Sequence, residues 1–116
     1  MLPIDKHAVL AHHALFDHLE TAEREQLLAL GMERRFKEGQ MIFRRGETGS
    51  HMMLVLRGQV KISIVSEDGK ELTFILIPPG ECFGEIALLD GQPRTTDATA
   101  VGECVLFTLA RQDFIP

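Results

Sequence analysis

The chain has 116 residues, of which 45% are hydrophobic, and its twelve basic and seventeen acidic side chains give a net charge of -5. This length suffices for one domain with one core and is short for two. The acidic balance disfavours direct DNA binding, because phosphate contacts need clustered lysine and arginine. The sequence has no apolar run of about 18 residues, no signal-peptide pattern and only two cysteines. We therefore expect a cytoplasmic protein with no membrane span, no disulfide framework and no metal knuckle.

Helical spacing of apolar residues marks the N-terminal part. Residues 5–30 predict two short helices with a break near 17–21, in which Thr21 is the expected N-cap and Gly31 the expected end of the second helix. The expected buried stripe of that helix is Leu27, Leu28 and Leu30. Four of the five histidines also fall here and are interpreted as polar helix surface: His7, His12, His13 and His18.

From residue 33 the pattern changes to short β-rich runs separated by glycine turns, which predicts an antiparallel β-sandwich. His51 is placed in a loop, and Cys82 and Cys104 are interpreted as small buried hydrophobic residues. The tail 110–116 predicts the start of another helix. We therefore divide a single domain, 1–116, into a helical part, 1–31, and a β-roll, 32–109. The expected strands are 33–36, 41–44, 52–56, 59–66, 71–77, 97–101 and 104–109.

The segment 83–96, Phe-Gly-Glu-Ile-Ala-Leu-Leu-Asp-Gly-Gln-Pro-Arg-Thr-Thr, is the strongest candidate for a binding site. Gly84 allows a backbone to approach a ligand closely, and Glu85 can accept hydrogen bonds from hydroxyl groups. Residues 86–89 can form one helical turn, whose free N–H groups favour an anion. Arg94 offers a forked cation that suits phosphate oxygens. Together these groups suit a small phosphorylated sugar.

This segment resembles the phosphate-binding cassette of cyclic nucleotide-binding domains, and the run 93–100, Pro-Arg-Thr-Thr-Asp-Ala-Thr-Ala, resembles bacterial regulators of the Crp/Fnr family. The resemblance implies an eight-stranded jelly roll (double-stranded β-helix) that follows N-terminal helices. It implies cAMP or cGMP as ligand, with the ribose at Gly84 and Glu85 and the phosphate at Arg94. The ligand-binding residues expected on this basis are Gly84, Glu85, Ile86, Ala87, Arg94, Thr95 and Thr96.

The resemblance also implies partners outside these residues. In the family, a long helix follows the β-roll, forms the homodimer interface and leads to a helix-turn-helix domain that binds DNA. The last residues of this chain would be the truncated start of that helix.

Several alternatives stay open on the sequence alone. The same domain could regulate a kinase, channel or transporter, or could have lost nucleotide binding, with Arg94 either paired to Glu85 or exposed in a turn. Haem bound through Cys82 or a histidine would make it a gas sensor. A metal-dependent barrel enzyme is disfavoured, because the expected strands carry no histidine to bind a metal, and we expect no enzymatic activity.

Overall fold

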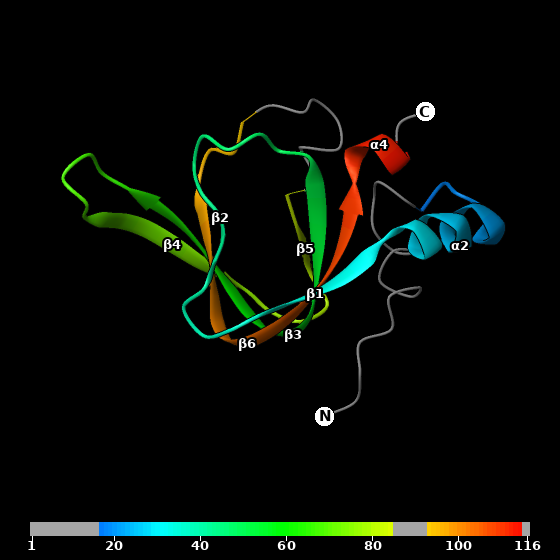
Figure 1. Ribbon diagram of the computed structural model, residues 1–116, viewed down its shortest axis with the longest axis horizontal. Coiled ribbons are helices and arrows are strands. Elements are labelled where there is room, and N and C mark those ends of the chain that lie inside the picture. The colour runs from blue at the N-terminus through cyan, green and yellow to red at the C-terminus, as the bar shows by residue number, and fades with distance from the viewer. Residues whose placement is uncertain (1–16, 85–92, 115–116) are drawn as a thin grey trace.

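A computed structural model describes residues 17–84 and 93–114 of the chain. In this part, six strands form an antiparallel β-roll, with two helices together at one end (Figure 1). The predicted fold class is confirmed, and the predicted first helix lies outside the described residues. The elements are α2 (Thr21–Leu30), β1 (Met32–Phe36), β2 (Met41–Phe43), β3 (His51–Val65), β4 (Glu71–Ile77), β5 (Cys82–Phe83), β6 (Asp97–Ala110) and α4 (Arg111–Phe114).

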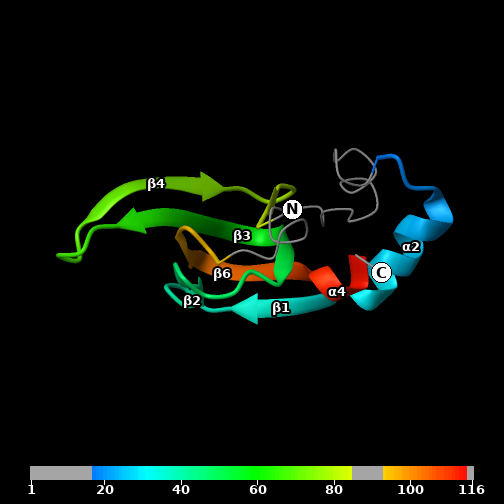
Figure 2. The same ribbon diagram turned by 90° about the horizontal axis from the view of Figure 1, so that it is seen from above.

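Two long strands, β3 and β6, pair with each other, and each contributes one half to each layer of the roll. Figure 2 shows them side by side, between β4 and β1. Their paired halves from Met52 to Val55 and from Leu106 to Leu109 join β1 and β5, and their other halves join β2 and β4. The register shifts on both sides of Arg57, where the strands bend. The sequence predicted separate strands at 52–56 and 59–66, and at 97–101 and 104–109, and these separations are wrong. Each pair is one bent strand.

Glycine permits this bend. Gly58 has a φ of +79°, and a Cβ atom there would lie 2.4 Å from the backbone oxygen of Glu103 on the neighbouring strand. Gly102 also has a positive φ, +73°. A glycine with positive φ inside a strand changes the strand's direction without ending its hydrogen bonding. Gly58 and Gly102, which suggested turns in the sequence, are therefore bends within continuous strands.

The core lies between the two layers, and each of the six described strands contributes to it, β4 through Ile77. Its members are fully or almost fully buried apolar residues. Cys104 is among them with 1% exposure, whereas Cys82 is half-buried, and the two form no disulfide with each other. The main cluster comprises Phe36, Phe43, Met53, Val55, Val60, Ile77, Phe83, Ala98, Ala100, Cys104 and Leu106.

The helix α2 begins one residue earlier than expected, with Glu20 at the N-cap instead of Thr21. The backbone N–H of Glu20 donates to the Glu23 carboxylate at 3.0 Å, which satisfies a group at the helix start. Leu27 and Leu28 pack against Met52 and Leu109, as the predicted stripe requires, but they are only partly buried. Leu30 was assigned to that stripe wrongly, because its side chain is 55% exposed.

Gly31 ends α2, as predicted, but with extended backbone at a φ of -77°. Its small size is required for a different reason: a Cβ atom there would lie 2.1 Å from the Phe107 ring. The glycine therefore lets the chain leave the helix directly against a buried aromatic residue of β6.

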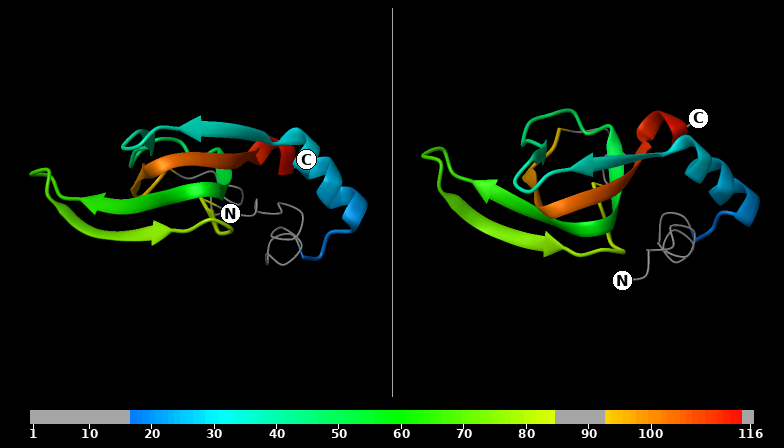
Figure 3. Two further views of the ribbon diagram at one scale, coloured as in Figure 1. Left: turned by 90° about the horizontal axis from the view of Figure 1, so that it is seen from below. Right: turned by 60° about the horizontal axis from the view of Figure 1, so that its bottom comes forward.

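The strand β4 is an edge strand of the sheet and pairs only with β3 among the described elements. The hairpin that joins them turns at Gly69 (φ +85°), as the sequence predicted, and projects from the end of the roll opposite α2 (Figure 3). At the edge of the sheet, most of the apolar side chains of β4 remain exposed. These are Leu72 (65%), Phe74 (55%), Ile75 (57%) and Leu76 (44%).

No helix among the described residues is long and apolar enough to cross a membrane.

Candidate functional site

Arg94 is fixed in place by its backbone, which lies along the loop between β2 and β3. Its N–H donates to the oxygen of Glu47 at 2.7 Å, and its own oxygen accepts from the N–H of Gly46 at 2.8 Å. An isolated bridge joins the neighbouring residues Thr48 and Pro93. Arg94 is therefore part of a small, locally paired ribbon, and its side chain starts from a defined position.

The guanidinium of Arg94 turns inward, which excludes the exposed turn residue considered from sequence. Its Nη2 donates to the backbone oxygen of His51, and its Nη1 donates to the oxygen of Gly84 at 3.4 Å. Its Cζ atom lies 4.3 Å from the centre of the Phe43 ring. Within residues 17–84 and 93–114, no carboxylate forms an ion pair with this guanidinium.

Burial lowers the pKa of Arg94, because a low-dielectric surrounding disfavours the charged form, and the nearby carboxylate of Glu47 acts in the opposite direction. The guanidinium nevertheless stays charged at neutral pH. The described contacts of Arg94 thus hold a half-buried positive charge with two carbonyl oxygens and an aromatic ring, all of them uncharged. None of these described contacts neutralises the charge.

Gly84 lies directly beside that guanidinium. Its φ is +75°, and a Cβ atom at this position would lie 2.7 Å from Nη1 of Arg94 and 3.2 Å from the oxygen of His51. The sequence suggested that this glycine admits a ligand. In the structure, its lack of a side chain already makes room for the arginine.

The other predicted site residues have different outcomes. Thr95 is exposed and Thr96 is half-buried. Glu85, Ile86 and Ala87 lie outside the described residues. The structure therefore brings Gly84 and Arg94 together, and the roles of all seven residues stay predictions.

Two residues at the site were missed by reasoning from sequence. Phe43, at the end of β2, places its ring under the Arg94 guanidinium, and His51 supplies its backbone oxygen. His51 was placed in a loop, but it is the first residue of β3. Neither contact carries a local sequence signal, since any apolar strand residue resembles Phe43 and any residue type offers a carbonyl.

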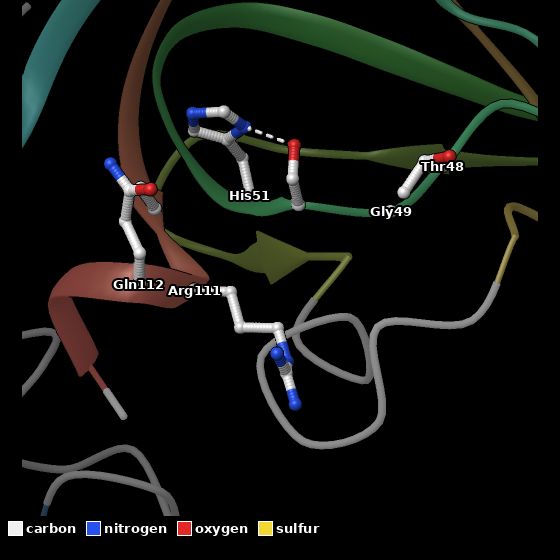
Figure 4. Close-up of a pocket in the computed structure, with 7 residues that line it drawn as sticks. Thr48, Gly49, His51, Arg111 and Gln112 are labelled. Carbon is white, nitrogen blue, oxygen red and sulfur yellow. Dashed lines mark hydrogen bonds between the residues drawn. The ribbon is translucent and has the colours of Figure 1, made fainter. Parts of the chain in front are cut away.

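A cavity of about 360 Å³ lies next to this arrangement, between the segment Thr48–His51 and the start of α4 (Figure 4). The Nδ1 atom of His51 shares a hydrogen bond with the Ser50 hydroxyl at 2.9 Å, and the N–H of Arg111 donates to the oxygen of Ser50 at 2.7 Å. The side chain of Arg111 points away from those of His51 and Gln112 (Figure 4), so the polar groups do not converge on one point. Its Nε atom is buried and has no hydrogen-bond partner among residues 17–84 and 93–114.

The pKa of His51 is lowered, first by burial and then by the positive charges of Arg34 and Arg94, while Asp113 opposes the shift. The neutral imidazole is therefore favoured at this end of the site. Among the described residues, no three histidine, cysteine, aspartate or glutamate side chains come together as a metal site would require.

The family model of the cyclic nucleotide-binding domain matches residues 33–116. The chain belongs to this family.

Individual relatives agree with this assignment. The domain is 36% identical over 101 residues to a protein named cyclic AMP receptor protein from Thermus thermophilus, and 34% identical over 100 residues to a cAMP-dependent protein kinase regulatory subunit from Eremothecium gossypii. These alignments cover 87% and 86% of this chain, and 47% and 21% of the two relatives. The chain therefore spans about half, or less, of the length of these relatives.

The fold is shared with a solved structure, the N-terminal domain of a transcriptional regulator from Streptomyces coelicolor A3(2). The TM-score is 0.81 at 33% sequence identity, over 90% of this chain and 73% of that one. The names of these three relatives describe a receptor protein, a kinase regulatory subunit and a transcriptional regulator.

Proposed function

We propose that this domain binds a cyclic nucleotide, cAMP or cGMP, and is the effector-binding part of a Crp/Fnr-type transcription regulator. The observation that carries the proposal is the charge arrangement at Arg94. A half-buried guanidinium whose described contacts are all neutral retains a full positive charge. A cyclic phosphodiester carries one negative charge, so one arginine is enough to balance it in a partly buried site.

In this proposal, the remaining site residues complete the ligand contacts. Glu85 accepts a hydrogen bond from the ribose 2′-hydroxyl, the N–H groups of Ile86 and Ala87 assist Arg94 at the phosphate, and Thr95 and Thr96 supply hydroxyl groups. A site built around a ribose hydroxyl discriminates against analogues that lack it, because the acceptor would stay unsatisfied.

The signal would reach DNA through parts of a longer protein. A bound nucleotide would favour one placement of a helix that continues from α4, and so bias a helix-turn-helix domain. We propose a homodimer in the cytoplasm for that protein. The similarity to transcription regulators supports this output, and the similarity to a kinase regulatory subunit supports a second candidate, in which the same domain controls a kinase.

The test is calorimetric titration of the chain with cAMP and cGMP, comparing the wild type with Arg94→Ala. Two charge-assisted hydrogen bonds to a phosphate contribute about 3 kcal/mol, so the substitution should weaken binding by about 100-fold. Arg57→Ala removes an exposed arginine elsewhere on the roll and serves as the matched control. Binding that Arg94→Ala leaves unchanged would reject the site.

The stability of Arg94→Ala must be measured alongside its affinity. Its removal leaves the oxygens of His51 and Gly84 without this donor, and a buried carbonyl that loses its partner costs about 1–3 kcal/mol. Circular dichroism should still show a folded β-protein, with a lower midpoint of urea unfolding.

A further inference from the structure

We infer that Phe43 is a positioning residue for Arg94: its ring holds the guanidinium in the orientation that meets an anion. The geometry on which this rests is direct. The Cζ atom of Arg94 lies 4.3 Å from the ring centre, well within the range of a cation–π contact. Phe43 is itself only 7% exposed, so the ring is fixed within the core.

The ring is also tied to the strand that leads into the site. Phe43 packs against Phe83, with ring centres 6.1 Å apart and planes tilted by 40°. Phe83 is 5% exposed and directly precedes Gly84, whose oxygen accepts a hydrogen bond from Arg94. The Phe43 ring of β2 thus contacts the Arg94 guanidinium on one side and the Phe83 ring of β5 on another.

A neutral ring suits this position better than a carboxylate would. An aspartate or glutamate would hold the arginine more strongly, but it would cancel the positive charge and compete with an incoming anion. The negative face of an aromatic ring attracts the guanidinium without neutralising it. Phe43 therefore restricts the arginine's rotamers in advance, which lowers the entropy lost when an anion binds.

The chain contains a matched control for this role. Phe36 belongs to the same core cluster, is 6% exposed, and has a different arginine, Arg34, at 5.3 Å from its ring centre. Phe36→Leu and Phe43→Leu should therefore lose similar amounts of stability from the core. Only Phe43→Leu should release Arg94.

The first readout does not depend on any ligand. In a proton–nitrogen NMR spectrum, the Nε–H signal of Arg94, assigned by its loss in Arg94→Ala, should be shifted upfield by the ring current of Phe43. It should return to the position of exposed arginines in Phe43→Leu and stay in place in Phe36→Leu. An Arg94 signal that is the same in the wild type and in Phe43→Leu would overturn the inference.

The second readout is affinity for cAMP, which rests on the proposed function. Phe43→Leu should weaken binding about 3- to 10-fold, as expected for a partly buried cation–π contact, whereas Phe36→Leu should bind like the wild type. A trifluorinated phenylalanine at position 43 keeps the ring's shape but removes its negative face, and should weaken binding as Leu does. Equal losses in the Phe36 and Phe43 variants, or full affinity with the fluorinated ring, would reduce Phe43 to ordinary core packing and refute its role. If the wild type bound no cAMP while the Arg94 signal moved as expected, the proposed function would fail, but the role of Phe43 in positioning Arg94 would be supported.

Discussion

Replacing Gly84 with alanine tests the tight contact between this residue and Arg94. The substitution has two separate effects. Gly84 has a φ of +75°, and placing an L-residue in that left-handed region costs about 1–2 kcal/mol. The new Cβ atom would also lie 2.7 Å from Nη1 of Arg94, so the guanidinium must move and lose its hydrogen bond to the oxygen of residue 84. That loss adds about 1 kcal/mol.

Gly39→Ala separates the two effects. Gly39 has a nearly identical φ of +78°, and a Cβ atom there would meet nothing within 4 Å. Urea unfolding should show a loss of about 1–2 kcal/mol for Gly39→Ala and about 1 kcal/mol more for Gly84→Ala. In calorimetry, Gly84→Ala should bind cAMP about 10-fold more weakly, because the displaced guanidinium must be brought back. Gly39→Ala should bind normally. Equal stability and equal affinity in the two variants would refute the argument that Gly84 makes room for Arg94.

Two further predictions concern packing and pH. Gly31→Ala should destabilise the domain by about 1–3 kcal/mol through overpacking, because the added Cβ would lie 2.1 Å from the buried Phe107 ring while the φ of -77° is unstrained. Urea unfolding measures this, and an unchanged free energy of unfolding would contradict it. Because the pKa of His51 is lowered in the folded state, the folded state binds fewer protons than the unfolded state. Well above pH 6.5, His51 is neutral in both states and does not change the free energy of unfolding. As the pH falls through 6.5, the unfolded state takes up the proton first, and stability decreases until the pH passes the folded-state pKa. His51→Gln should therefore show a smaller loss of stability between pH 7.5 and 5.5 than the wild type, and identical pH profiles would speak against the shift.

Much of the fold could be predicted because its signals are local. Alternation in 59–66, the turn at Gly69 and the change of pattern at residue 33 each depend on a few neighbouring residues. The divisions of β3 and β6 were wrong because Gly58 and Gly102 look like turn residues in a sequence, whereas only the paired neighbouring strand shows that the chain continues. The sequence also does not show that the apolar side chains of β4 are exposed, because an edge strand and a central strand can have the same composition.

The site divides in the same way. Gly84 and Arg94 lie ten residues apart, so their spacing in the chain could suggest a common role. His51 lies 43 residues before Arg94, and Phe43 comes from another strand again, so only the folded sheet brings them to the arginine. The contributions of Glu85, Ile86, Ala87, Thr95 and Thr96, and the division at residue 31, stay predictions.

The position of β6 at the centre of the sheet has a consequence for synthesis on the ribosome. β6 pairs with β1, β2 and β3, yet it is the last strand to be made. In a nascent chain that stops before Asp97, β1, β2 and β3 lack the strand with which all three pair. The roll can therefore close only once the residues of β6, Asp97–Ala110, have left the exit tunnel.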